Sequence, residues 1–397
     1  MSDARRDLVR KAKRIVVKVG SSVLTSDGQL RSRVFGDLAR QIHEAEGHRQ
    51  FVIVSSGAIA MGSRMLGWSH PGRSIPEKQA AAAVGQIGVM ETYQRRFSRY
   101  GRKVAQVLVT RSGLQDRERF LNARHTLTTL LDLGVVPIVN ENDTVATEEI
   151  RFGDNDNLSA TVLNLVGGDL LVLLSDVDGL YERRPEPGKP LPPFIDVVER
   201  IDASIRRAAS GAGSAFGSGG MTTKLEAAQT AAHSGAATVV CNGRRRDSIA
   251  RLLAGEPIGT LFLPGDRMTS RKHWLAYTTR PRGEMVIDDG AVRALREGGK
   301  SLLPAGVVAV RGRFGIGDPV ACVDGAGLEI ARGLAAYASG EVERIRGLDT
   351  RKVAKVLGYS NGNAVVHRDD LVLLEPSESS REPRAEPSTE PSTEQPG

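Results

Sequence analysis

The chain has 397 residues and a formal net charge of +7, with 54 lysines and arginines against 47 aspartates and glutamates. Because single cores stop growing at about 250–300 residues, this length predicts more than one domain. Two isolated cysteines, Cys241 and Cys322, exclude a disulfide framework and a CxxC metal pair. A charged N-terminus and the lack of any run near about 18 apolar residues argue against a signal peptide and a membrane span. We therefore expect a soluble, cytoplasmic protein with no membrane partner.

The positive charge is unevenly distributed. Residues 375–397 hold six glutamates and two arginines, so the rest of the chain carries +11. The same segment repeats "EPST" and has almost no apolar residues, which predicts a disordered acidic tail over 374–397. The basic remainder suits anionic ligands such as nucleotides, and it suits RNA equally well.

In chain order, short β-branched runs alternate with amphipathic helical stretches from residue 14 to about 265. Such near-continuous apolar strands, alternating with helices, predict a three-layer αβα sandwich around a mainly parallel sheet. In open sheets of this kind, ligands bind beyond the carboxyl ends of the strands. The six predicted strand runs are "RIVVKVG" (14–20), "QFVIVSSG" (50–57), "KVAQVLVT" (103–110), "VVPIVNEND" (135–143), "DLLVLLSDVDG" (169–179) and "ATVVCNG" (237–243).

The pattern changes after residue 267. Short strands separated by glycine turns fill residues 285–333, which predicts a separate, small β-rich domain. The predicted organisation is an N-terminal extension (1–13), an α/β domain (14–270), a linker (271–281), the β-rich domain (282–373) and the tail.

Two early loops contain candidate anion-binding groups. Lys18 ends the first strand run, and a lysine there needs an anion nearby unless it snorkels from an edge strand. Ser55, Ser56 and Gly57 begin a helix, where backbone N–H groups bind carboxylate or phosphate. An ordinary serine N-cap explains the second loop equally well.

The stretch "NENDTVATEEIRFGDNDNLSA" (140–160) contains two dense clusters of acids and amides. One Asp or Asn suffices to cap a helix, so residues 140–143 and 154–157 exceed what capping requires. Calcium binding is an alternative, but the spacing lacks the EF-hand pattern. We favour a site that holds an ammonium group and positions a lysine.

Two later loops complete the set. Ser175 and Asp176 end a strand, where a turn explains them and a nucleotide contact is the alternative. The stretch "FGSGGMTTK" (216–224) leads a glycine run into a helix, with Thr222 and Thr223 as cap candidates, but it is not a Walker A motif. The positive charge of Lys224 in the first helical turn interacts unfavourably with the helix dipole, by about 0.3–1 kcal/mol. A bound polyanion would make a positive charge at this position favourable.

Taken together, "VVKVGSSVL", "VIVSSGAIAMG", "RERFLNARHTL", "VVPIVNENDTVA", "FGDNDNLSA" and "GSGGMTTK" resemble the glutamate 5-kinases of the amino acid kinase family. The match runs in order over residues 14 to about 265. Residues 282–360, with "VRGRFGIGDPV", resemble the PUA domain that many of these kinases carry, and "GYSNGNAVVHRDD" (358–370) resembles their C-terminal end.

The resemblance implies ATP-dependent phosphorylation of the L-glutamate γ-carboxylate, the first step of proline synthesis. It also implies Mg²⁺, feedback inhibition by proline, a homodimer or homotetramer, and transfer of the product to glutamyl phosphate reductase. Lys18, Lys224 and Asp156 are implied as catalytic, and Ser56, Asp143 and Asn155 as glutamate-binding. The implied ATP-binding residues are Lys18, Ser175, Asp176, Ser218, Gly219, Gly220, Met221, Thr222, Thr223 and Lys224.

Elementary chemistry agrees with this activity. A glutamate side chain with a pKa near 4.3 is already ionised at neutral pH, so the reaction needs no general base. The seven histidines are scattered, and none lies in the acid-amide loops. Two alternatives are an RNA-binding protein acting through the PUA-like region and a kinase for aspartate, acetylglutamate, carbamate or a nucleoside monophosphate. Few aromatics in the PUA-like region disfavour RNA.

Overall fold

The computed structural model describes residues 3–26, 29–45, 47–146, 155–183, 185–186, 188–209, 220–265 and 270–374. Ser218, Gly219 and nearly all of the predicted tail lie outside these residues. The chain divides into two compact units, Met1–Thr279 and Arg280–Gly397. No helix in the described ranges combines the length and apolar character needed to cross a membrane.

The first unit is built around a sheet of eight strands in the described residues, in the order β10-β12-β11-β7-β1-β4-β6-β5. All neighbouring strands pair in parallel except β11 and β12, which are antiparallel. The strands are β1 (Arg14–Val19), β4 (Gln50–Ser55), β5 (Val104–Val109), β6 (Val136–Glu141), β7 (Leu170–Ser175), β10 (Val197–Val198), β11 (Ala237–Asn242) and β12 (Thr260–Phe262).

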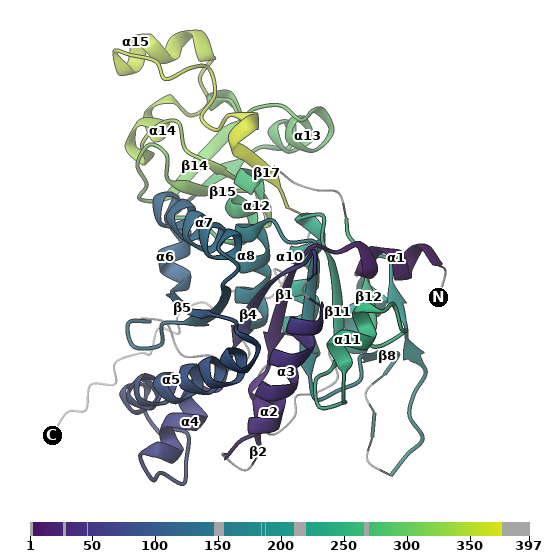
Figure 1. Cartoon of the computed structure of the whole chain (residues 1–397). Coiled ribbons are helices and arrows are strands. Elements are labelled where there is room, and N and C mark those ends of the chain that lie inside the picture. The colour runs from purple at the N-terminus through teal and green to yellow at the C-terminus, as the bar shows by residue number, and fades with distance from the viewer. Residues whose placement is uncertain are drawn as a thin grey trace, which may run out of the picture. The chain divides into compact units, whose positions relative to one another are not determined.

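Helices cover both faces of this sheet, and α3 and α11 lie in front of it in Figure 1. The helices of this unit are α1 (Asp3–Lys11), α2 (Ser21–Leu24), α3 (Ser32–Ala45), α4 (Ala58–Met65), α5 (Ile75–Phe97), α6 (Arg111–Gln115), α7 (Arg117–Asp132), α8 (Asn155–Val166), α9 (Ala203–Ala209), α10 (Met221–His233), α11 (Ser248–Leu253) and α12 (Ser270–Tyr277). Two short hairpins pair β2 (Thr25–Ser26) with β3 (Gln29–Leu30) and β8 (Leu180–Tyr181) with β9 (Phe194–Ile195). All six predicted strand runs form strands of the main sheet, so the predicted α/β fold is confirmed.

Alternation along β1 decides which side chains face which helices. Ile15, Val17 and Val19 belong to the core that contains Phe35 of α3 and Ile249 of α11. Because successive strand residues point to opposite faces, Lys18 points to the other face. On that face α8 contacts α10.

The second unit contains a separate sheet in the order β14-β13-β15-β16-β17. Its own apolar core is built around buried side chains that include Met285, Val320 and Tyr337. The predicted β-rich second domain is therefore confirmed as a fold class. Its elements are β13 (Gly283–Ile287), β14 (Val307–Gly312), β15 (Pro319–Val323), β16 (Glu329–Leu334), β17 (Leu371–Leu373), α13 (Asp289–Gly298), α14 (Ser339–Ile345) and α15 (Val353–Leu357).

The predicted linker, residues 271–281, includes most of α12. Trp274 in this helix is buried, and its indole Nε1 donates a hydrogen bond to the carbonyl oxygen of Leu114 at 3.0 Å. The segment therefore packs on the first unit, because an apolar ring and its N–H group both find partners there.

Candidate active site

A buried cluster of one carboxylate and two lysines lies beyond the carboxyl end of the central strands. Lys18 comes from β1, Asp156 from the first turn of α8, and Lys224 from the first turn of α10. Only 5% of Lys18, 0% of Asp156 and 6% of Lys224 is exposed. Because β1 pairs with β4 on one side and β7 on the other, Lys18 does not lie on an edge strand, and the snorkelling alternative is wrong.

Each oxygen of the Asp156 carboxylate holds one lysine. Lys18 Nζ lies 2.7 Å from Oδ1, and Lys224 Nζ lies 3.3 Å from Oδ2. The hydroxyl of Thr223 also donates to Oδ2, at 2.8 Å. Asp156 thus positions two lysines, where we predicted that the acid-amide clusters position one.

Burial and charge act in opposite directions on the pKa values of this cluster. Burial lowers the pKa of Lys18, and the positive charge of Lys224 lowers it further, whereas Asp156 opposes both effects. Burial alone would raise the pKa of Asp156, but the charges of Lys18 and Lys224 outweigh it and hold that pKa below its usual value. Asp156 is therefore ionised at neutral pH.

The start of α10 differs from the prediction in one respect. The N-cap is Gly220, not Thr222 or Thr223, and the helix begins at Met221. The hydroxyl of Thr223 is bonded to Asp156 and to the carbonyl oxygen of Gly220 instead. A carboxylate accepts a stronger hydrogen bond than a neutral group does, so the threonine takes part in the lysine cluster rather than in capping.

A second group of polar side chains surrounds Asn155, next to Asp156 in the sequence. The amide Nδ2 of Asn155 donates to Ser56 Oγ at 2.9 Å and to Asn140 Oδ1 at 3.1 Å. Gly57, directly after Ser56, has φ of 104° and is the N-cap of α4. A glycine there permits the left-handed backbone that turns β4 into α4. The structure therefore brings together Ser56 and Asn155, which we predicted as substrate-binding residues.

The amide group of Asn140 is itself held by a residue that sequence reasoning missed. Its Nδ2 donates to Gln86 Oε1 at 3.0 Å, and both side chains are buried. Gln86 lies within the alanine-rich middle of α5, more than 50 residues from Asn140, and nothing in its surrounding sequence indicates a polar contact. The sequence around Gln86 does not indicate this contact because the contact depends on how α5 packs against the sheet.

Asp143 lies beyond the end of β6 and is partly buried. Burial, together with the nearby negative charge of Glu141, raises its pKa from 3.8 to about 6. A cationic partner would lower the pKa of a carboxylate in this environment, because an opposite charge stabilises the ionised form.

Ser175 and Asp176 lie at and just past the end of β7, which is next to β1 in the sheet. Ser175 Oγ donates to Asp176 Oδ1 at 3.3 Å. Asp176 also lies 3.7 Å from Arg244 Nη2, an ion pair that sequence reasoning did not anticipate. The arginine comes from the segment after β11, and the neighbouring positions of β7 and β11 bring the two residues together.

Comparison with known proteins identifies the family. The amino acid kinase family matches residues 13–242, which is more than half of the chain. The chain belongs to this family. The PUA domain matches residues 283–357.

Curated relatives narrow the identification within the family. A glutamate 5-kinase of Geobacter sulfurreducens is 49% identical over 373 residues, which cover 93% of this chain and 100% of that protein. Glutamate 5-kinases of Paraburkholderia phymatum and Burkholderia mallei are 50% and 51% identical, again over 93% of this chain and 100% of theirs. The predicted resemblance to glutamate 5-kinases with a C-terminal PUA domain is confirmed.

Proposed function

We propose that the chain catalyses transfer of the ATP γ-phosphoryl group to the γ-carboxylate of L-glutamate, the first step of proline biosynthesis. The observation that carries the proposal is the buried cluster in which Asp156 binds both Lys18 and Lys224. Near-complete alignment with glutamate 5-kinases at about half identity supports this substrate.

The lysine cluster fits the needs of phosphoryl transfer. Most of the catalysis of this reaction comes from positioning and from stabilising charge on the transferring group. The three buried side chains carry two positive charges and one negative charge. An incoming phosphoryl group, which is negative, complements the positive charge that remains. We assign Lys18 and Lys224 to this role, and Asp156 to holding the two ammonium groups in place.

The polar group around Asn155 fits the substrate amino acid. In this proposal Asn155 and Ser56 bind the α-carboxylate side of glutamate, and Asp143 accepts the α-ammonium group. An ammonium group beside Asp143 offsets the desolvation that raises its pKa. The γ-carboxylate is already ionised at neutral pH, so it attacks without a general base.

ATP-binding residues are proposed from the same geometry and the family resemblance. Gly220, Met221, Thr222 and Thr223 form the start of α10, where backbone N–H groups bind phosphate. Ser175 and Asp176 are proposed for the nucleoside end.

Magnesium would add positive charge at the β- and γ-phosphates when bound. Mg²⁺ usually binds through one or two carboxylates together with phosphates and water. No group of three or more His, Cys, Asp or Glu in the described ranges forms a ready metal site, and both oxygens of Asp156 are bound to lysines. The residues present therefore suit a Mg²⁺ ion whose ligands would come largely from the phosphates of ATP. Proline inhibition, a homodimer or homotetramer, and transfer of product to glutamyl phosphate reductase stay predictions from the family.

The test of the proposal measures ATP turnover and captures acyl phosphate with hydroxylamine, using the whole protein with and without proline. Glutamate should give the hydroxamate, whereas aspartate, acetylglutamate, carbamate and nucleoside monophosphates should not. Turnover with one of those acceptors in place of glutamate would contradict the assignment. A salt-dependent RNA titration separates the RNA-binding alternative.

Changing Lys224→Ala tests the catalytic cluster. We expect kcat to fall by about 10²-fold or more, because a preorganised positive charge is lost from the transition state. Lys103→Ala, an exposed lysine before β5, is the matched control and should leave kcat unchanged. Near-normal turnover in Lys224→Ala would remove this lysine from the proposed role.

A further inference from the structure

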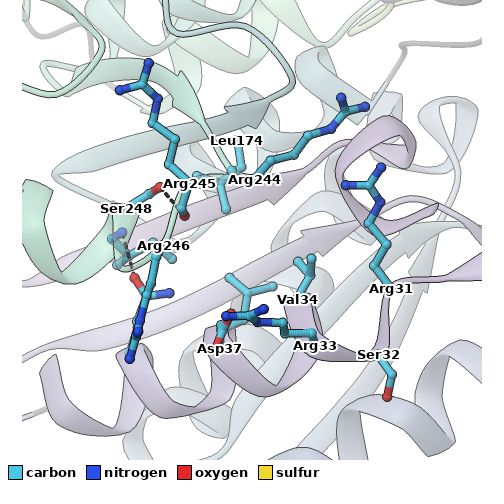
Figure 2. A pocket seen from close by; sticks show the side chains of 14 residues that line it. Arg31, Ser32, Arg33, Val34, Asp37, Leu174, Arg244, Arg245, Arg246 and Ser248 are labelled. Atoms are coloured by element: carbon cyan, nitrogen blue, oxygen red, sulfur yellow. Dashed lines mark hydrogen bonds and ion pairs between the residues drawn. The ribbon is translucent and has the colours of Figure 1, made fainter. Parts of the chain in front are cut away.

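A cavity of about 510 Å³ lies between the start of α3 and the segment that joins β11 to α11. Among the described residues, five arginines line it, and Asp37 is the only acidic residue that does. Arg31 and Arg33 come from the α3 wall, and Arg244, Arg245 and Arg246 from the opposite wall (Figure 2). This volume is within the range of about 300–1,000 Å³ that small-molecule sites occupy.

The two walls are fixed to each other by buried hydrogen bonds. Gln41 of α3 is buried, and its Oε1 accepts hydrogen bonds from the backbone N–H groups of Ile249 at 2.8 Å and Ala250 at 3.1 Å. Ser248 Oγ donates to the carbonyl oxygens of Asn242 and Arg245. The arginine-bearing segment is therefore held in one conformation against α3, as a preformed site requires.

Arg244 Nη2 lies 3.7 Å from Asp176 and Arg245 Nη2 lies 2.5 Å from Asp178, so the charge most open to a ligand is that of the other three arginines. Arg33 Nε lies 3.8 Å from Asp37 Oδ2, and Arg246 Nε lies 3.4 Å from Asp247 Oδ2. The side chains of these two arginines are 82% and 78% exposed, respectively. Exposed pairs of this kind contribute little, at most about 1 kcal/mol. Arg31 Nε is buried and has no hydrogen-bond partner among the described residues. A guanidinium group binds phosphate or carboxylate with two parallel hydrogen bonds, so several of them favour a polyanion.

The cavity is separate from the lysine cluster. Leu174 lines the cavity and belongs to the core on the α3 face of the sheet, whereas Lys18 points to the other face. The cavity is thus a second basic site, on the face of the sheet opposite to Asp156 and its two lysines.

Arg244 connects this cavity to the candidate ATP site. Its Nη2 donates to the carbonyl oxygen of Ser22 at 2.9 Å and lies 3.7 Å from Asp176. Ser22 lies in α2, four residues after Lys18, and Asp176 follows β7. A ligand that draws the guanidinium group into the cavity removes a partner from both residues.

We propose that this cavity binds a small polyanion with two or more phosphate or carboxylate groups, and that its occupancy weakens ATP binding through Arg244. The first part stands on the cavity alone, and the second part rests on the proposed function. The size of the cavity selects a small molecule rather than a nucleic acid chain.

The binding test uses calorimetry on the whole protein, saturated with a non-hydrolysable ATP analogue at a constant excess of Mg²⁺ so that the ATP site is filled. Inorganic pyrophosphate and citrate are titrated separately, which distinguishes phosphate from carboxylate ligands. We expect at least one of them to bind with one-to-one stoichiometry. The double variant Arg31→Gln/Arg33→Gln should weaken that binding tenfold or more.

Matched variants make the result specific. Arg99→Gln/Arg119→Gln removes the same charge from exposed residues elsewhere and should bind as the parent does. If Arg31→Gln/Arg33→Gln unfolds at a lower temperature, Arg33→Gln/Arg246→Gln replaces it, because both of those side chains are highly exposed. The proposal is overturned if neither anion binds with the ATP site filled, or if the cavity variants bind as tightly as the parent.

The kinetic test examines the connection to ATP. The bound anion should raise the KM for ATP several-fold in the parent without changing the KM for glutamate, and Arg31→Gln/Arg33→Gln should abolish this rise. An equal rise in parent and variant would show competition at the ATP site alone and overturn the connection. Calorimetry does not need turnover, so a failure of the proposed kinase activity is distinguishable from a failure of the cavity proposal.

Discussion

At the scale of single residues, the proposed glutamate site depends on Gln86, a side chain outside the loops that form the site. Gln86 holds Asn140, and Asn140 in turn accepts a hydrogen bond from Asn155. Asn155 also contacts Ser56. An amide side chain has both donors and acceptors, so each member of the chain fixes the orientation of the next.

Changing Gln86→Leu should raise the KM for glutamate about tenfold while kcat changes much less. Leucine is close to glutamine in size but leaves the amide of Asn140 without its buried partner, which costs about 1–3 kcal/mol. Steady-state kinetics with glutamate and ATP varied in turn measures the effect. Gln94→Leu, at an exposed position of the same helix, is the control. Equal rises in the two KM values would indicate a general structural defect.

Asp143 predicts a pH dependence. Burial and the charge of Glu141 raise its pKa to about 6. Below that pH the folded protein keeps Asp143 protonated and unable to pair with the ammonium group of glutamate. We therefore expect kcat/KM for glutamate to rise as pH increases through about 6, and Asp143→Asn should remove this inflection and raise the KM for glutamate far more than that for ATP.

The sign for stability is the opposite. Between pH 3.8 and about 6 the unfolded chain loses the Asp143 proton while the folded protein retains it, so this residue lowers stability as pH rises through that window.

Asp132→Asn, at an exposed position, is the control for the kinetic profile. An inflection near pH 6 that persists in Asp143→Asn would come from another group.

At the scale of elements, the contact between α4 and α5 depends on two glycines. A Cβ atom on Gly85 would lie 1.9 Å from the carbonyl oxygen of Ala58, and one on Gly62 would lie 1.7 Å from that of Ala81. Backbone atoms cannot move aside as a side chain does. The two helices therefore approach at the distance that only glycine permits, and α4 begins directly after the loop that holds Ser56.

Changing Gly85→Ala should lower stability by about 3 kcal/mol, at the upper end of what overpacking usually costs. The KM for glutamate should rise as well, because the start of α4 must move. Thermal unfolding and steady-state kinetics measure the two effects. Gly88→Ala on the same helix is the control, since the atoms nearest to its Cβ would belong to the flexible side chains of Met61 and Met65 and not to backbone. Equal losses in both variants would contradict the packing argument.

At the scale of the whole molecule, the residues of the proposed active site all lie in the first compact unit. Each unit has its own apolar core. A chain that ends at Thr279 should therefore fold and keep kcat for glutamate phosphorylation within about threefold of the parent. Circular dichroism checks the fold, and the hydroxamate assay checks the activity. A loss beyond tenfold in a folded truncated chain would assign the second unit a part in catalysis.

The sequence by itself determined the α/β sheet, the β-rich second domain and the loops at the ends of the strands. It could do so because near-continuous apolar runs and glycine turns are local signals, which depend only on residues adjacent in the chain. Local signals also drew attention to Lys18, Lys224 and the cluster around Asp156. The pairing of the three could not be read locally, since β1, α8 and α10 are far apart in the chain.

Only the tertiary structure decided which side chains meet. It placed β1 in the centre of the sheet. It also showed that Thr223 donates a hydrogen bond to Asp156 instead of capping the helix, and that Gln86 accepts one from Asn140. It also set the arginines after β11 opposite Arg31 and Arg33 at the start of α3, where the sequence shows only two separate basic stretches. These contacts join distant segments, and their geometry follows from strand order and helix packing rather than from any local pattern.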